Sequence, residues 1–257
     1  MIINIKEWVN ERKKEIAEQN NNSPSLLVLQ LDNEDYSSDS YTKTLVKDMK
    51  ECKIDATVFK TTNSDKMINF VRKAMIEEYD AVIVQNPWRL PEDVRNIIFS
   101  NITPKQDVDG LTENSLYKPC TPCAIMEIIK NWFPKKDLKG VIVAVVGKGE
   151  LVGKPLVPML MDQGATIISC NSQTKDIPAL TRQADIVISA TGCEYTIMNN
   201  MVKDGAFVVD AGFSWKGKGD CDPCMYENEK IAITSVPDGV GLMTRLMLIQ
   251  NVIEAAK

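Results

Sequence analysis

Short apolar runs alternate with amphipathic segments in the first half of the chain. Three runs have the length and β-branched content of buried strands. They are Ser25–Leu31, Asp55–Lys60 and Asp80–Gln85. Residues Ser64–Glu78 carry apolar side chains at helical spacing, with Ser64 as the expected N-cap. Residues 86–94 and 101–111 contain prolines and show no periodicity, which indicates irregular loops.

A second series of apolar runs fills the rest of the chain. Its members are Val141–Gly147, Ala165–Cys170, Ala184–Gly192, Ala206–Gly212 and Ala232–Pro237. Nearly continuous apolar strands are typical of a parallel sheet buried on both faces. Residues 1–19 and 242–257 have the spacing of amphipathic helices.

These patterns predict an α/β fold with two lobes, because strands and helices alternate in both series. We expect an N-terminal catalytic lobe at residues 1–120, joined by a C-terminal helix at residues 241–257. Residues 121–240 are expected to form a Rossmann-like lobe with a parallel sheet that binds a dinucleotide.

Charge and cysteine usage narrow the choice of partners. The formal net charge of −5 disfavours a broad nucleic-acid or anionic-membrane surface, so small molecules are the expected partners. No apolar run is long enough to span a membrane, and the N-terminus lacks the continuous apolar core of a signal peptide. The seven cysteines are expected to be reduced thiols, which indicates a soluble cytoplasmic protein.

Histidine is absent from the sequence, which restricts the possible chemistry. Nucleophiles activated by histidine, zinc held by imidazole and proton transfer by imidazole are all excluded. The pairs Cys120/Cys123 and Cys221/Cys224 offer four thiolates for zinc. Zinc ribbons separate their pairs by only about 15–20 residues. Because these two pairs are much further apart, we favour buried thiols and predict no metal site.

Three glycines follow the first strand of the second series. Gly147, Gly149 and Gly153 lie between that strand and a segment in which Pro155 suits the first turn of a helix. Glycine allows the backbone to approach a diphosphate, and the helix N-terminus offers free N–H groups. The G-x-G-x-x-x-G spacing is one residue longer than the usual fingerprint, so a simple chain reversal is the alternative.

The end of the next strand indicates which dinucleotide binds. An NAD site normally has an acidic residue there for the ribose 2′-hydroxyl. Here Asn171 and Ser172 follow the strand, and no acid occurs before Asp176. Lys148, Asn171 and Ser172 are instead suited to a 2′-phosphate, so the sequence predicts NADP.

Six segments, in order along the chain, resemble the bifunctional methylenetetrahydrofolate dehydrogenase/cyclohydrolase family. They are Val84–Pro91, Lys105–Leu111, Pro119–Pro122, Val145–Pro155, Lys203–Phe213 and Val236–Thr244. The resemblance implies a homodimer of two-lobed subunits, with the folate bound between the lobes and NADP on the Rossmann-like lobe. Family members oxidise 5,10-methylenetetrahydrofolate to the methenyl form, and most then hydrolyse that product to 10-formyltetrahydrofolate.

The resemblance also assigns site residues by their places in these motifs. It implies that Tyr41, Gln85 and Asp109 are catalytic, with the Asp109 carboxylate and Tyr41 also contacting the folate. Pro237 and Gly239 are implied on the folate side. Gly192 and Phe213 join the glycine turn as residues expected to contact the cofactor. Asp238, in place of a family glycine, and Asn86 depart from the pattern.

Leu45 is the departure with the greatest functional consequence. The family has a lysine four residues after the tyrosine that matches Tyr41, and this lysine serves the hydrolytic step; here that position is Leu45. Lys43 and Lys47 lie well around the helix axis from it. Because an aliphatic side chain transfers no protons, we predict a dehydrogenase with little or no cyclohydrolase activity.

Three alternatives remain open at this point. The first is a fully bifunctional enzyme, and the second is a degenerate relative that binds folate or nucleotide without catalysis. The third is an NADP oxidoreductase that acts on a small carbonyl compound. This last class ordinarily needs a Tyr/Lys pair or a histidine as proton donor, and the sequence around Tyr41 has no Tyr-x-x-x-Lys pair.

Overall fold

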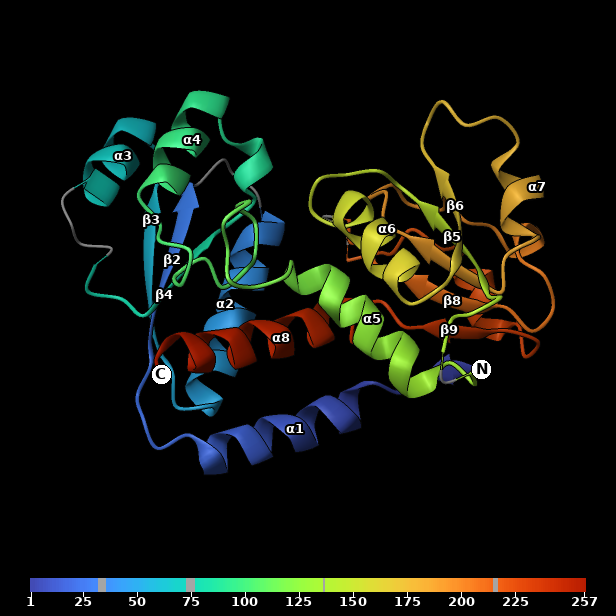
Figure 1. The fold of residues 1–257 in the computed structure, drawn as a ribbon, viewed down its shortest axis with the longest axis horizontal. Helices are drawn as coiled ribbons and strands as arrows, with labels where there is room; N and C mark the ends of the chain where they lie inside the picture. Colours follow the sequence, from blue (N-terminus) through green and yellow to red (C-terminus); the bar gives the residue numbers. More distant parts are fainter. Residues whose placement is uncertain (32–35, 73–76, 136, 215–216) are drawn as a thin grey trace. The chain divides into compact units, whose positions relative to one another are not determined.

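The computed structural model describes residues 1–31, 36–72, 77–135, 137–214 and 217–257 (Figure 1). The chain forms two compact units. One contains Met1–Asn10 and Thr121–Thr244, and we call it the dinucleotide unit. The other contains Glu11–Cys120 and Arg245–Lys257, and we call it the catalytic unit.

The catalytic unit is built on a three-stranded parallel sheet in the order β3-β2-β4. Its strands are β2 (Ser25–Leu31), β3 (Asp55–Thr61) and β4 (Ala81–Val84). Its helical elements are α2 (Tyr36–Glu51), α3 (Ser64–Arg72), η1 (Pro87–Arg89) and α4 (Glu92–Ser100), with most of α1 (Lys6–Gln19) and α8 (Val240–Ala255).

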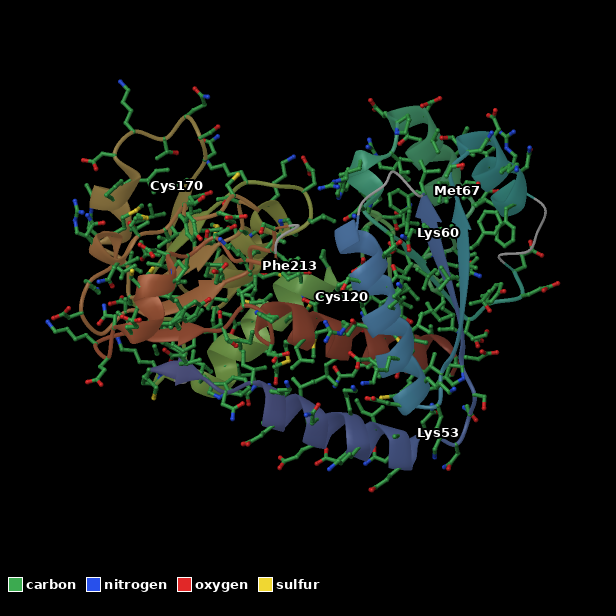
Figure 2. The ribbon with its side chains drawn as sticks, turned by 180° about the vertical axis from the view of Figure 1, so that it is seen from behind. Lys53, Lys60, Met67, Cys120, Cys170 and Phe213 are labelled. Carbon is green, nitrogen blue, oxygen red and sulfur yellow. The ribbon has the colours of Figure 1, made fainter. Side chains whose placement is uncertain are left out.

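Both faces of this sheet are covered, because alternate residues of β2 point to opposite sides. Leu26 and Val28 pack with buried residues of α2 and α8. Leu27 and Leu29 pack with buried residues of α3 and α4, including Met67, which is labelled in Figure 2. The unit therefore has two apolar layers, one on each side of the sheet.

The dinucleotide unit contains a six-stranded parallel sheet in the order β1-β9-β8-β7-β5-β6. The strands are β1 (Ile2–Ile3), β5 (Ile142–Val146), β6 (Thr166–Cys170), β7 (Ile186–Ser189), β8 (Phe207–Asp210) and β9 (Ala232–Thr234). The helical elements are α5 (Cys120–Trp132), α6 (Gly153–Asp162), α7 (Ile177–Thr181), η2 (Asn199–Met201) and η3 (Pro223–Glu227). The α/β class and the Rossmann-like parallel sheet are thus confirmed.

Three local expectations differ from the structure. Ser64 is the first residue of α3, and Asn63 caps this helix, since its side-chain oxygen accepts from the Lys66 N–H at 3.0 Å. The helix ends at Arg72, and residues 73–76 of its expected continuation lie outside the described residues. Residues 86–94, expected as a loop, contain η1 and the start of α4, because Glu92 and Asp93 favour a helix N-terminus.

Residues 1–10 were expected in the first lobe but belong to the dinucleotide unit. β1 pairs with β9 in parallel, with Ile2 opposite Ile233. The two-residue strand satisfies backbone groups at an edge of the sheet that would otherwise be open. A strand this short leaves no periodic signal in a sequence. No helix in the described parts of the chain has the length and apolar character needed to cross a membrane.

Candidate active site

The glycine turn after β5 is shaped by close backbone contacts. Gly147 has φ +114°, and a Cβ added there would lie 2.3 Å from the Ala190 carbonyl oxygen. A Cβ on Gly153 would lie 1.9 Å from the Gly147 carbonyl oxygen. Gly149, in contrast, faces open space. Two glycines therefore let the turn close, and the third leaves room beside the backbone.

This turn lies where the carboxyl ends of three strands meet. The Gly147 N–H donates to the Cys170 carbonyl of β6 at 2.9 Å, and the Ala190 N–H beyond β7 donates to the Val146 carbonyl at 2.8 Å. β5 lies between β6 and β7 in the sheet, so chain connections leave it on both sides. In α/β sheets a crevice for ligands forms at such a switch point.

The residues after β6 fit a phosphate rather than a hydroxyl. Burial raises the pKa of the Cys170 thiol, and the positive charge of Lys148 opposes this rise, which places Lys148 near the end of β6. Ser172 is exposed, and the Asn171 side-chain oxygen accepts from the Gln173 N–H, which fixes the turn. Residues 171–175 include no acid. The donors present therefore suit an NADP 2′-phosphate.

The two other predicted cofactor residues follow neighbouring strands of the same sheet. Gly192 comes after β7, with φ +68° and open space beside it. Phe213, which is labelled in Figure 2, follows β8. This residue is 55% exposed. Because β7 and β8 are adjacent and parallel, both residues lie at one edge of the sheet with the glycine turn.

In the catalytic unit, the loop that carries Asp109 is held by its neighbours. Asp107 accepts hydrogen bonds from the Thr112 N–H and hydroxyl, both at 2.7 Å, so this carboxylate serves the loop itself. Gly110 has φ +70°, and a Cβ there would lie 2.5 Å from the Lys118 carbonyl carbon. Asn251 of α8 donates to the Val108 carbonyl at 2.8 Å. Asp109 thus projects from a rigid loop.

Tyr41 of α2 and Asp109 lie close enough to affect each other. Burial raises the pKa of Tyr41, and the negative charge of Asp109 raises it further, whereas the Arg245 charge lowers it. Burial together with the charge of Asp107 raises the pKa of Asp109 to about 7, against a hydrogen bond from the Cys120 thiol. The structure therefore brings together two residues that the sequence predicted separately. Perturbed pKa values of this kind are typical of functional sites.

Gln85 directly follows β4, and its N–H donates to the Leu29 carbonyl at 2.9 Å. Its side-chain nitrogen is buried and has no hydrogen-bond partner among the described residues. An unpaired buried donor costs about 1–3 kcal/mol. Gln85 is therefore suited to donate to a ligand.

Leu45 is fully buried in the apolar layer between β2, α2 and α8. Lys43 and Lys47 are exposed on other faces of α2, and the Lys47 ammonium lies 4.0 Å from the Glu51 carboxylate. Neither lysine occupies the position of Leu45, as the helical spacing predicted.

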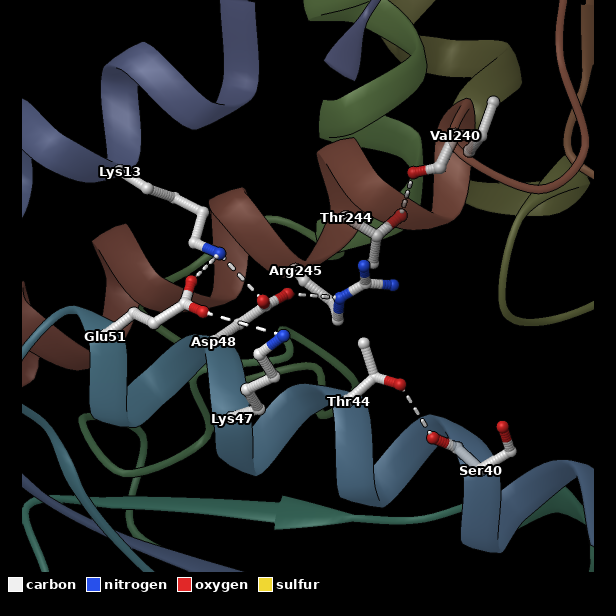
Figure 3. Close-up of polar contacts among 9 residues, drawn as sticks. All are labelled: Lys13, Ser40, Thr44, Lys47, Asp48, Glu51, Val240, Thr244 and Arg245. Atoms are coloured by element: carbon white, nitrogen blue, oxygen red, sulfur yellow. Dashed lines mark hydrogen bonds and ion pairs between the residues drawn. The ribbon is translucent and has the colours of Figure 1, made fainter. Parts of the chain in front are cut away.

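Two cations, Arg245 and Lys13, bind a buried carboxylate of α2 (Figure 3). Arg245 of α8 donates through Nε to Asp48 of α2 at 2.6 Å, and Lys13 of α1 donates to the same carboxylate at 2.7 Å. Asp48 lies seven residues after Tyr41, on the same face of α2. The sequence interpretation missed this cluster, because no local pattern links residues 13, 48 and 245.

The predicted folate-side residues Pro237 and Gly239 lie in the dinucleotide unit. Pro237 is exposed, and a Cβ on Gly239 would lie 2.2 Å from the Ser235 carbonyl oxygen. Asp238 between them has φ +73° and pairs with Lys6 at 3.0 Å. This ion pair gives the extra acid a partner within its own unit.

None of the seven cysteines forms a disulfide. Cys120 and Cys221 are buried, whereas Cys224 is exposed. Among the described residues, no group of three or more cysteine, aspartate or glutamate side chains is arranged to hold a metal ion.

Comparison with known proteins identifies the family. Residues 119–257 match the model of the tetrahydrofolate dehydrogenase/cyclohydrolase NAD(P)-binding domain. The bifunctional protein FolD of Campylobacter jejuni strain RM1221 is 32% identical over 269 residues, which cover 95% of this chain and 94% of that protein. FolD of Aquifex aeolicus is 33% identical over 270 residues, covering 98% and 91%.

Comparison with solved structures indicates the same family. The crystal structure of the bifunctional enzyme FolD from C. jejuni has a TM-score of 0.87 at 31% identity and covers 100% of this chain and 98% of its own. The Trypanosoma brucei methylenetetrahydrofolate dehydrogenase-cyclohydrolase, complexed with NADP cofactor and inhibitor, has a TM-score of 0.87 at 25% identity, covering 99% and 96%. The resemblance read from the six motifs is confirmed: this chain belongs to the tetrahydrofolate dehydrogenase/cyclohydrolase family.

Proposed function

We propose that the protein oxidises 5,10-methylenetetrahydrofolate to 5,10-methenyltetrahydrofolate, with NADP as the hydride acceptor. The observation that carries this proposal is the closed glycine turn at Gly147 and Gly153, followed by a β6 end without an acid. Family membership and the NADP complex of the T. brucei relative support the same cofactor. The proximity of Tyr41 and Asp109, whose negative charge raises the pKa of Tyr41, supports a folate site in the catalytic unit.

The chain's own residues then have binding and positioning roles. NADP, when bound, supplies the acceptor for the hydride that leaves the methylene carbon. The backbone of the glycine turn and the start of α6 bind the diphosphate, and Lys148 with Ser172 holds the 2′-phosphate. Asp109 accepts hydrogen bonds from the N–H groups of the pterin, and the Gln85 amide donates to the substrate. No protein acid or base is required for hydride transfer, so alignment is the main contribution.

The test is an absorbance assay of NADPH formation with methylenetetrahydrofolate, with NADP and NAD compared. NADPH formation supports the dehydrogenase. Purified, folded protein that binds both ligands without forming NADPH is instead the degenerate relative.

We further propose that cyclohydrolase activity is weak or absent. A proton-transferring group contributes about 10²–10⁴-fold to a rate of this kind. Leu45 is fully buried, and it transfers no protons. If the purified protein hydrolyses methenyltetrahydrofolate well above the buffer rate, the bifunctional alternative is correct.

Lys148→Ala is expected to weaken NADP binding about tenfold and to leave NAD binding unchanged, because a charged contact to the 2′-phosphate is lost. Calorimetric titration with both nucleotides measures the difference. Lys130→Ala, which removes an exposed charge on α5, is the matched control. Equal weakening of NADP and NAD would contradict the assignment of Lys148 to the 2′-phosphate.

Asp109 is expected to make stability depend on pH. Its pKa in the fold is raised to about 7 from 3.8, so the folded protein binds the proton more tightly than the unfolded chain. The stabilising effect of that proton is complete below about pH 4 and is lost as pH rises through about 7. Wild-type protein should therefore lose stability relative to Asp109→Asn across this window.

Urea unfolding of both proteins at pH 5 and pH 8, without ligands, measures this effect. Asp185→Asn is a useful comparison, because the pKa of Asp185 is lowered, so this carboxylate is charged in both the folded and unfolded states from pH 5 to pH 8 and contributes no pH dependence there. A wild-type to Asp109→Asn difference that is the same at both pH values would show that Asp109 has an ordinary pKa.

The assembly and compartment remain proposals. We infer a homodimer from the family, which sedimentation analysis of the purified protein tests. Seven cysteines without a disulfide favour a reducing compartment, and we propose the cytoplasm.

A further inference from the structure

Two buried carboxylates lie beneath the loops that follow β7 and β8. Asp210, the last residue of β8, is 1% exposed, and Asp220 is fully buried. The Asp210 Oδ1 accepts from the Asp220 N–H at 3.0 Å, so the two residues are directly linked. Burying a carboxylate costs several kcal/mol unless its hydrogen bonds compensate. The bonds that these acids receive therefore indicate what the pair does.

Asp220 holds the end of β7. Its Oδ2 accepts from the Ser189 hydroxyl at 2.8 Å and from the Thr191 N–H at 2.7 Å. Its Oδ1 is buried, has no partner among the described residues, and lies 1.9 Å from where a Cβ on Gly212 would be. The Asp220 carboxylate thus accepts hydrogen bonds from the end of β7 and the segment that follows it. Because its other oxygen lies against Gly212, a residue with a Cβ does not fit at that position after β8.

Asp210 binds the segment after β8 and the residue that follows Asp220. It accepts from the Gly212 N–H at 2.9 Å and from the Cys221 N–H at 2.9 Å. The bond from the Cys221 backbone gives the second C-x-x-C segment a structural role. The segments after β7 and β8 and residues 219–221 are therefore fixed as one piece.

The segment that Asp220 holds also touches the glycine turn. The Ala190 carbonyl, between Ser189 and Thr191, is the oxygen that a Cβ on Gly147 would approach to 2.3 Å. β6, which is followed by the proposed 2′-phosphate site, lies on one side of β5, and β7 and β8 lie on the other. A dinucleotide whose diphosphate is bound at the turn and whose adenosine half lies toward β6 has its second half toward β7 and β8.

We propose that Asp220 is a positioning residue for the nicotinamide half of NADP: its carboxylate fixes the Thr191–Gly192 segment, and its backbone N–H links that segment through Asp210 to Gly212–Phe213. This inference rests on the proposed NADP site. It adds a residue that touches no ligand itself and that acts through the backbone of two loops.

The test compares NADP with adenosine 2′,5′-bisphosphate, which contains the adenosine half alone. Asp220→Asn keeps the shape and can still place its amide oxygen at the Oδ2 position, but that oxygen is neutral, so the bonds from Ser189 and Thr191 are weakened. The Kd for NADP is expected to rise about tenfold, because two hydrogen bonds to a charged acceptor become bonds to a neutral one. The Kd for the bisphosphate is expected to be unchanged. Asp222→Asn is the matched control, because Asp222 caps η3 through the Cys224 N–H.

Ser189→Ala provides a second variant, since it removes one donor from Asp220 and leaves the carboxylate in place. It should weaken NADP binding in the same selective way, by a smaller factor. Equal losses for both ligands, or no loss for either in folded variants, would overturn the inference while the NADP site stands. Wild-type protein that binds neither ligand would overturn the proposed NADP site, and the inference with it.

Discussion

Replacing Leu45 by lysine is expected to raise the hydrolysis of methenyltetrahydrofolate by about 10²-fold or more over the wild-type rate. The substitution restores a proton-transferring group one helical turn after Tyr41, and such groups contribute about 10²–10⁴-fold. Burial in the apolar layer around Leu45 lowers the pKa of the new lysine, which favours its neutral, basic form. The decay of methenyltetrahydrofolate absorbance measures the gain.

The same substitution is expected to destabilise the protein by about 2–5 kcal/mol, because a polar group replaces a fully buried leucine. Leu45→Met keeps the volume and controls for packing, and Val46→Lys places a lysine on another face of α2. Neither control should gain hydrolysis. If folded Leu45→Lys oxidises its substrate normally and still hydrolyses nothing, the missing lysine is not what limits this enzyme.

Gly147→Ala is expected to weaken NADP binding by more than about 100-fold and to destabilise the protein by about 2–4 kcal/mol. A Cβ at this position would lie 2.3 Å from the Ala190 carbonyl oxygen, and the residue has φ +114°. The turn and the end of β7 would have to separate, which deforms the expected diphosphate site. Calorimetric titration with NADP and thermal unfolding measure the two effects.

Gly140→Ala separates strain from collision. Gly140 also has a positive φ, of +71°, but a Cβ there meets nothing within 4 Å. It should cost about 1–2 kcal/mol of stability and leave NADP binding intact. If Gly147→Ala binds NADP as well as Gly140→Ala does, the close approach at the turn is not needed for the cofactor.

Most strands could be located from the sequence because they are buried on both faces. β2 was predicted at its observed bounds, and β5 and β7 fall within their predicted runs. When a continuous apolar run is bounded by polar turn residues, the ends of the strand can be predicted closely. Features that depend on a polar capping contact or on pairing with a distant strand were harder to predict. The Asn63 cap, α4 and β1 are the examples.

For the candidate site, the sequence predicted the glycine turn, Tyr41, Gln85 and Asp109, because turn geometry and family motifs depend on residues that are consecutive in the chain. Leu45 also stood out, since a fixed helical spacing defines its position. No local pattern indicated that Arg245 lies beside Asp48, or that Asp220 binds the segment after β7. These contacts join residues separated by tens to hundreds of positions, and many other pairings of the same charges are equally compatible with the local pattern.

Hydrophobic spacing and the order of motifs, by themselves, determined the fold class, the family and the place of the glycine turn, because burial and backbone conformation constrain residues close together in the chain. Only the tertiary structure decided which charges neutralise one another, which carboxylates are buried and which backbone groups they hold. Those outcomes depend on the distances between atoms of different elements, and Coulomb and hydrogen-bond energies change over a few ångströms that no sequence pattern encodes.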